Sequence, residues 1–168
     1  MNGILLTCQP TDYYKCSNFF AMVRIYISAP LFNRMEKEFN AYIDERLRSM
    51  GFETYLPQRD GYEASSLYDS GTMWEDIKSK IFKKDVEELK RSEILFMVLD
   101  GRVPDEGACV ELGMAYTLGK TCIGVQTDSR KFQMDNNNPM IDGSLNGGLF
   151  YSLEDAFKQL QNQVYKKI

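Results

Sequence analysis

The chain has 168 residues, of which 43% are hydrophobic and 26% charged, with a formal net charge of −4. This composition fits one globular domain that can bury a core, and its acidic balance excludes the basic stripe of a protein that binds a nucleic-acid polymer. The sequence contains no histidine, which excludes Ser-His and Cys-His nucleophiles and the commonest zinc sites, so any acid–base chemistry belongs to other side chains.

The chain begins with a segment that we expect to lie outside the working domain. Residues 1–21 lack the apolar centre of a signal peptide, and a clean strand starts at Met22. We therefore predict a disordered extension or an upstream start over residues 1–21, and a single domain over residues 22–168. No stretch approaches the roughly 18 to 20 apolar residues of a membrane span. We expect a cytoplasmic protein in which Cys109 and Cys122 are buried free thiols.

Apolar stretches and turn residues alternate regularly along the rest of the chain. Pro30 stops the first strand, Asn33 is a typical helix N-cap, and Gly51 ends the helix that follows. The predicted elements, in chain order, are a strand at residues 22–29, a helix to about 50, a strand at 52–56, a loop or short irregular helix at 58–71, a helix at about 73–91, a strand at 94–99, a helix at about 107–118, a strand at 122–125, a polar loop at 127–148, a strand near 149–151 and a helix from 153 to about 164.

This alternation predicts an α/β fold with a doubly wound, flavodoxin-like parallel sheet of about five strands and helices on both faces. The continuous apolar stretch at residues 94–99 is typical of a central strand that is buried on both sides. Ligands of such folds bind beyond the carboxyl ends of the strands. The segments to inspect are therefore residues 28–32, 57–60, 100–111 and 127–148.

Glu111 lies at an unusual place in the predicted helix 107–118. At about 100° per residue it falls in the middle of a helix face formed by Gly107, Ala108, Leu112, Met114, Ala115, Leu118 and Gly119. This face should pack on the sheet, and burying an unpaired carboxylate is costly, so Glu111 needs a partner or an opening. An ordinary salt bridge, or a rotated helix with Glu111 in solvent, is the alternative. A position near the helix amino end favours the ionised, nucleophilic form.

Asp85 is the candidate for a second acid. It lies on the predicted long helix with Ile81 and Leu89 four residues to either side, which places it on an apolar-leaning row. Two carboxyl groups in different environments can divide the roles of nucleophile and proton donor.

Three pieces of the sequence resemble the nucleoside 2-deoxyribosyltransferase family. They are IYISAPLF at residues 25–32, the acid Asp85, and DEGACVELGMAY at residues 105–116. Their order and spacing carry the resemblance, with one aspartate six residues and another 26 residues before Glu111. The similarity covers about residues 23–160. The family often has glycines after its first strand, where this chain has Ser28 and Pro30.

The resemblance implies three catalytic residues. Glu111 falls on the nucleophile that attacks C1′ and forms a covalent deoxyribosyl-enzyme. Tyr26 falls on the tyrosine that orients this carboxylate, and Asp85 on the aspartate near the base, as proton donor or relay. No metal or organic cofactor is implied.

The resemblance also implies substrate-binding residues. Asp105 would hold the sugar 5′-hydroxyl together with Asn146 of a neighbouring subunit, so a homo-oligomer with shared active sites is implied. Phe32 matches an aromatic wall for the base, and Gln58 is a looser candidate for reading base edges. Each has a plainer interpretation: Tyr26 and Phe32 as core aromatics, Asp105 as a helix cap, and Asn146 as a turn residue.

The implied activity is exchange of 2-deoxyribose between nucleobases, with deoxynucleosides and free bases as partners. If water accepts the sugar, the enzyme is a hydrolase. A 2′-deoxynucleoside 5′-monophosphate N-glycosidase is the nearest rival: Ser28 and Ser144 keep it open, whereas Asp105 would repel a phosphate dianion. A non-catalytic nucleotide-binding module is more distant, because no glycine-rich phosphate loop is present. A phospho-receiver domain is disfavoured, because Ser28 and its neighbours supply no acidic pair.

Overall fold

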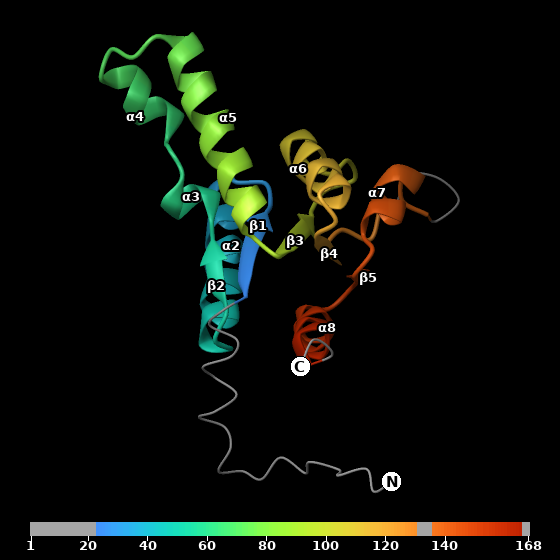
Figure 1. Ribbon diagram of the computed structural model, residues 1–168. Coiled ribbons are helices and arrows are strands. Elements are labelled where there is room, and N and C mark those ends of the chain that lie inside the picture. Colours follow the sequence, from blue (N-terminus) through green and yellow to red (C-terminus); the bar gives the residue numbers. More distant parts are fainter. Residues whose placement is uncertain (1–22, 131–135, 166–168) are drawn as a thin grey trace, which may run out of the picture.

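The computed structural model describes residues 23–130 and 136–165, so the predicted extension lies outside the described residues. Five parallel strands form one sheet in the order β2-β1-β3-β4-β5 (Figure 1). The strands are β1 (Arg24–Ser28), β2 (Glu53–Tyr55), β3 (Ile94–Leu99), β4 (Thr121–Gln126) and β5 (Gly148–Phe150). This order confirms the predicted flavodoxin-like parallel sheet.

The two faces of the sheet bury different side chains. On one face, Ile25 and Ile27 of β1 pack with α2 (Arg34–Ser49) and α8 (Leu153–Tyr165). On the other face, Tyr26 packs with residues of α5 (Trp74–Arg91) and α6 (Glu106–Thr117), and α7 (Pro139–Ser144) lies against the same cluster. Every residue of β3 is buried, as its continuous apolar sequence predicts.

Helix boundaries follow local capping chemistry. Asn33 accepts a hydrogen bond from the backbone of Glu36, whose side chain bonds back to the Asn33 backbone, so α2 begins with the predicted cap. The segment 58–71, predicted as a loop or a short irregular helix, holds two short helices, α3 (Pro57–Asp60) and α4 (Ala64–Asp69). Pro57 stands at the first turn of α3, where its missing N–H costs nothing. Similarly, α7 interrupts the predicted loop 127–148, with a cap from Asn138.

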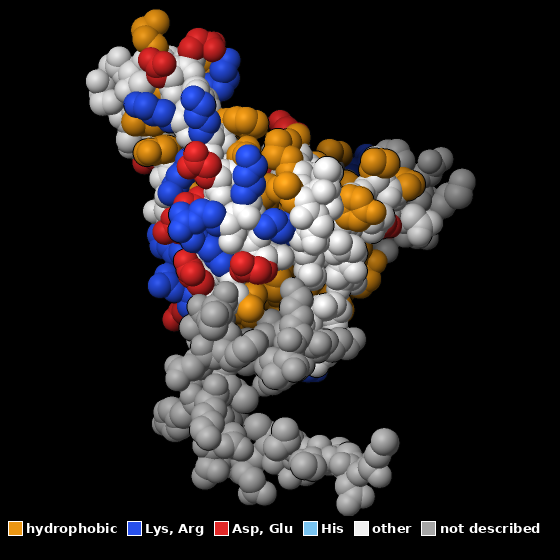
Figure 2. Space-filling view, viewed as in Figure 1, with side chains coloured by type: hydrophobic (Ala, Val, Ile, Leu, Met, Phe, Trp, Pro, Cys, Tyr) orange, Lys and Arg blue, Asp and Glu red, His pale blue; other side chains and the backbone are white. Residues whose placement is uncertain are grey.

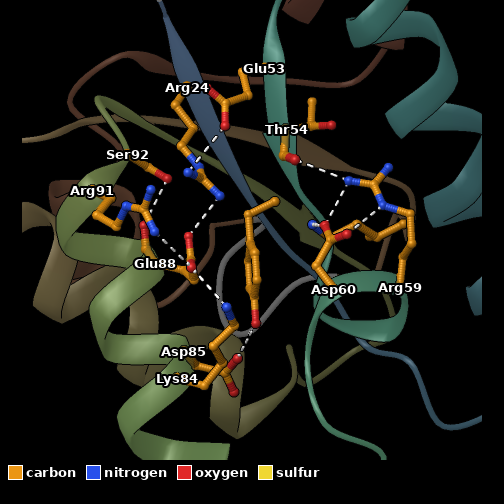
Figure 3. Close-up of polar contacts among 12 residues, drawn as sticks. Arg24, Glu53, Thr54, Arg59, Asp60, Lys84, Asp85, Glu88, Arg91 and Ser92 are labelled. Carbon is orange, nitrogen blue, oxygen red and sulfur yellow. Dashed lines mark hydrogen bonds and ion pairs between the residues drawn. The ribbon is translucent and has the colours of Figure 1, made fainter.

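Helix α5 is held beside the sheet by a buried carboxylate. Glu88 is only 3% exposed and forms ion pairs with Arg24 of β1 at 2.7 Å, with Lys84 at 2.9 Å and with Arg91 at 3.3 Å (Figure 3). Breaking such a buried pair leaves an uncompensated charge, which is strongly unfavourable. The cluster therefore fixes the carboxyl-terminal part of α5 and, with it, Asp85 one turn earlier. The amino-terminal part of α5 projects beyond the sheet with α4 beside it (Figure 1).

Both cysteines in the described residues are free thiols, with Cys122 buried and Cys109 partly buried. Along the described ranges, no helix combines the length and apolar character that crossing a membrane requires.

Candidate active site

Glu111 reaches the sheet from the side of α6. The row of α6 that is buried comprises Ala108, Leu112 and Ala115, and Glu111 lies next to this row, partly buried. The buried face is narrower than predicted: Gly107 and Gly119 are exposed and Leu118 is 48% exposed. A single helix on a sheet buries only the row directly above the strands, so the outer residues of the predicted face remain in solvent.

Two hydroxyl groups of β1 hold the Glu111 carboxylate. Tyr26 Oη donates to Oε1 at 2.7 Å, and Ser28 Oγ donates to Oε2 at 2.6 Å. The two donors are two residues apart in one strand and therefore project from the same face. Both residues are 0% exposed. Glu111 thus points toward the sheet, which excludes the alternative of a rotated helix with this carboxylate in solvent.

The surroundings of Glu111 disfavour its charged form. Burial raises the pKa of Glu111 to about 7, against the opposing effect of the hydrogen bonds from Ser28 and Tyr26, and the charges of Asp85 and Asp105 raise it further. The helix amino end was expected to favour the ionised form of Glu111, but burial outweighs this effect. Glu111 is the sixth residue of α6, and the influence of a helix terminus fades within its first turn. Near neutral pH this carboxyl group therefore exchanges readily between its two forms.

Tyr26 remains a hydrogen-bond donor at all ordinary pH values. Burial raises the pKa of its phenol far above the usual value, and the negative charges of Glu111 and Asp85 raise it further. The phenol therefore keeps its proton and continues to bind Glu111.

Asp85 approaches from α5 and meets the second tyrosine of this region. Tyr55 Oη of β2 donates to Asp85 Oδ1 at 2.9 Å. Burial raises the pKa of Asp85, although the hydrogen bond from Tyr55 and the charge of Lys84 oppose the shift. A carboxyl group with a raised pKa keeps a proton closer to neutrality and is better suited to donate it.

Asp85 and Glu111 line the same groove between α5 and α6. The groove has a volume of about 390 Å³, and hydrophobic side chains gather between these helices on the surface (Figure 2). Its apolar walls include Trp74, Phe82 and Val110, which are 58%, 57% and 56% exposed. A groove with apolar walls and two carboxyl groups suits a flat, weakly polar ring whose substituent reaches the acids.

Asp105 stands at the start of α6 and acts as its N-cap. Its Oδ2 accepts a hydrogen bond from the Ala108 backbone at 2.8 Å, which is the plainer of the two roles considered for it. Its charge still acts on Glu111, whose pKa it raises. Asp105 therefore belongs to the electrostatic surroundings of the carboxylate pair.

Phe32 and Gln58 are not brought to Glu111 within this chain. Phe32 is 77% exposed and lines a separate hollow over the start of α2. Gln58 faces α2, where its amide donates to the Lys37 carbonyl at 2.8 Å and accepts from Asn40 at 3.2 Å. Both side chains lie toward α2, and neither lines the groove between α5 and α6.

Asn146 lies beside β4, toward the edge of the sheet that is opposite to β2. Its side chain accepts from the Cys122 backbone at 2.8 Å and donates to the Lys120 carbonyl at 3.0 Å, so it meets β4 near the amino end of that strand. Glu111 instead meets the carboxyl-terminal half of β1. Within one chain the two residues are therefore apart, and a role for Asn146 in the site requires a neighbouring subunit.

Tyr55 is the residue of the site that the sequence analysis missed. It lies in the strand predicted at 52–56 and is 1% exposed, like an ordinary core aromatic. One signal was available, because a buried tyrosine hydroxyl needs a hydrogen-bond partner. In residues 23–130 and 136–165, no group of three or more Cys, Asp or Glu side chains is arranged to hold a metal ion.

The sheet order, together with a hydroxyl-bound glutamate and an aspartate along one groove, defines a flavodoxin-like α/β protein with a carboxylate-pair site. The family model for nucleoside 2-deoxyribosyltransferase matches residues 25–147, and the chain belongs to this family of enzymes that act on N-glycosidic bonds. A search among proteins of curated function finds no match.

Solved structures share the fold of this chain. A conserved protein from Enterococcus faecalis is 25% identical, with a TM-score of 0.71 over 84% of this chain and 99% of the other. A 2-deoxyribosyltransferase from Bacillus psychrosaccharolyticus is 24% identical, with a TM-score of 0.65 over 79% and 89%. A 2-deoxyribosyltransferase from Leishmania mexicana is 20% identical, with a TM-score of 0.60 over 81% and 95%.

Proposed function

We propose that this chain transfers 2-deoxyribose between nucleobases by double displacement through a covalent intermediate on Glu111. The observation that carries the proposal is the state of this side chain. It is a partly buried carboxylate, bound by two hydroxyls of β1, and it lines one groove with Asp85. A merely structural carboxylate on a packed helix would be expected to pair with a cation, whereas the hydrogen bonds described at Glu111 come from neutral donors.

In the first step, an oxygen of Glu111 attacks C1′ of a deoxynucleoside while the C1′–N bond breaks. The bonding electrons leave with the base, and Asp85 supplies the proton that the departing nitrogen needs. The product is a deoxyribosyl ester of Glu111 and a free base. The transition state has oxocarbenium character, as in retaining glycosidases, and Tyr26 and Ser28 hold the nucleophile in place.

In the second step, a nitrogen of another base attacks C1′ from the face that the first base left. The ester bond breaks, Glu111 regains its charge, and the incoming base returns its proton to Asp85. Two inversions retain the configuration at C1′. If water enters in place of the base, the product is free 2-deoxyribose and the reaction is a hydrolysis.

Chemical trapping tests the intermediate. Incubation with a 2′-fluoro-arabino nucleoside, followed by peptide mass spectrometry, is expected to place the fluorinated sugar on the peptide that contains Glu111. Glu111→Ala should give no adduct while still binding nucleoside, which the emission of Trp74, the single tryptophan of the chain, can report because this residue lines the groove. An adduct elsewhere, or none on the unaltered protein, contradicts the proposal.

Substrate comparison separates the related activities. Deoxyinosine and its 5′-monophosphate are each incubated with and without free adenine, and deoxyadenosine, hypoxanthine and free sugar are measured. Transfer predicts deoxyadenosine from deoxyinosine only when adenine is present. Hypoxanthine with free sugar in both cases indicates a hydrolase, and preference for the monophosphate indicates the N-glycosidase. The hydrogen bond from Ser28 to Glu111 argues against the last outcome, because it engages one of the two serines considered for phosphate.

A further inference from the structure

Two tyrosines stand side by side on neighbouring strands beneath the groove. Tyr26 of β1 and Tyr55 of β2 are directly paired in the sheet, and they are 0% and 1% exposed. Their ring centroids lie 5.2 Å apart, and the rings are tilted by 32°. Strand pairing therefore places two buried phenols next to each other on the face that α5 and α6 cover.

Each phenol binds a different acid. Tyr26 donates to Glu111 of α6 at 2.7 Å, and Tyr55 donates to Asp85 of α5 at 2.9 Å. Two acids from separate helices are thus tied to two adjacent strands. Parallel strands lie about 4.8 Å apart, and retaining glycosidases carry their two carboxyl groups about 5 to 5.5 Å apart. Two donors on adjacent strands are therefore close enough to hold two carboxyl groups at a separation of the kind that a double displacement uses.

We propose that Tyr55 is a positioning residue that holds Asp85 at the distance from Glu111 set by the neighbouring strand. The inference rests on the proposed function and adds a residue to its machinery. Tyr55 touches neither the substrate nor the nucleophile. It acts through Asp85, and its ring packs against Tyr26, so the two donors keep each other in place.

The other groups around Asp85 do not provide this hold. Lys84, next to it on α5, is paired with Glu88 at 2.9 Å, with its Nζ 5.7 Å from the centre of the Tyr55 ring. Figure 3 shows Lys84, Asp85 and Glu88 along this helix. The charged or titratable groups that act on or lie around Asp85 are Lys84 and Glu88 on α5, Tyr26 on β1, Tyr55 on β2 and Glu111 on α6. The described hydrogen bond at Asp85 comes from Tyr55.

The variant Tyr55→Phe removes the donor and keeps the packed ring. Its effect should depend on whether the leaving base needs a proton. With 2′-deoxyguanosine, kcat is expected to fall about 10-fold or more, which is a part of the roughly 100- to 10,000-fold that general acid catalysis contributes. With 7-methyl-2′-deoxyguanosine, whose base is already cationic and leaves without protonation, kcat should stay within about twofold. Equal losses on both substrates would show that Tyr55 serves the fold and not Asp85.

A double-mutant cycle shows whether Tyr55 acts through Asp85. In an Asp85→Asn background, Tyr55→Phe should cause no further loss on 2′-deoxyguanosine, whereas independent roles would give additive losses. Tyr68→Phe is the matched control, because Tyr68 is 68% exposed on α4 and should leave both substrates unaffected. Tyr26→Phe should slow both substrates, because it loosens the nucleophile itself.

Titration of the Asp85 carboxyl by carbon-13 NMR tests the contact without turnover. Asp85→Asn assigns the signal, and Tyr55→Phe should raise the pKa of Asp85, because the lost hydrogen bond lowers it. If the pKa of Asp85 rises but the unaltered protein cleaves no deoxynucleoside, the hydrogen bond from Tyr55 to Asp85 is supported and the proposed function is wrong. If the protein is active but the pKa is unchanged and both substrates slow equally, the positioning role is wrong.

Discussion

The carboxyl group of Glu111 is buried enough to disfavour its charged form. Its pKa is raised from 4.5 to about 7, so the folded state holds the proton more tightly than the unfolded chain does. The stability that follows from this difference is fully present below about pH 4.5 and is lost as the pH rises through about 7. The position that supports the proposed chemistry therefore weakens the fold at neutral and alkaline pH, which is a familiar exchange of stability for activity.

We expect Glu111→Gln to stabilise the protein in a pH-dependent way. Glutamine keeps the shape of the side chain and cannot ionise, so the free energy of unfolding should rise at about pH 8, by an amount on the order of 1–3 kcal/mol, and change little at about pH 5. Urea denaturation at both pH values measures the difference. The exposed Glu45→Gln serves as the control. An equal gain at both pH values would mean that packing, and not charge, limits stability at this position.

Ser28→Ala should shift the pH dependence of activity. The hydrogen bond from Ser28 lowers the pKa of Glu111, so its loss should raise that pKa and leave less ionised nucleophile at pH 7. The profile of kcat/KM against pH is then expected to move to higher pH, with activity recovering as the medium becomes more alkaline. Ser49→Ala on α2 should leave the profile in place. A uniform loss without displacement would assign Ser28 to substrate contact instead.

At the scale of elements, α6 depends on the residue that precedes it. Asp105 caps the helix that carries Glu111, and asparagine can cap as well as aspartate, whereas alanine cannot. Asp105→Ala should therefore lower the free energy of unfolding by about 1 kcal/mol, and Asp105→Asn by only a few tenths. Thermal or chemical denaturation of the three proteins compares them. Equal losses in both variants would show that the charge of Asp105, and not its cap, supports the helix.

Elements with strong local signals were predictable from the sequence. The continuous apolar stretch of β3, the Asn33 cap of α2 and the strand–helix alternation gave the parallel sheet and its helices, because each signal depends on near neighbours in the chain. For residues 58–71 the sequence left a loop or a short irregular helix open, and it did not show that the segment forms the two short helices α3 and α4. Their segment is polar, and helices of a turn or two are set by contacts with the rest of the fold rather than by their own propensity.

The two acids of the candidate site were predictable from the sequence. Of the hydroxyl groups that bind them, only that of Tyr26 was predicted to do so. Glu111 stood out as a charge on a helix face of small residues, and the resemblance supplied Tyr26. The hydrogen bond of Ser28 to Glu111 depends on how α6 packs on β1, and the role of Tyr55 depends on how β1 and β2 align. One sequence reveals neither. Phe32 and Gln58 lie toward α2 and do not line the groove within one chain. Their contacts with the base stay predictions.

At the scale of the whole molecule, the groove between α5 and α6 exposes apolar side chains to solvent. Trp74, Phe82 and Val110 line this groove and leave more than half of their surface exposed. Exposed apolar groups around a site are typical of surfaces that a ligand or a partner covers. A homo-oligomer that completes the site remains our expectation.

Subunit mixing tests the expected sharing of active sites. Glu111→Ala and Asn146→Ala are produced separately and then together in one cell, with a different purification tag on each. If Asn146 serves the site of a neighbour, mixed oligomers regain activity that neither variant has alone, because one intact site forms per mixed pair. Sedimentation measures the assembly. No recovery would confine Asn146 to its hydrogen bonds with β4, whose loss costs about 1 kcal/mol each.

The pairing of Tyr26 with Tyr55 makes the proposed chemistry sensitive to the number of residues in a turn. Side chains alternate between the two faces of a strand, so one residue added between Gly51 and Glu53 would turn the Tyr55 phenol toward α2 unless β2 slid to compensate. Asp85 would then lose its partner although no atom of either acid had been replaced. In this chain, a single-codon insertion far from the substrate is expected to be as damaging as a substitution in the site itself.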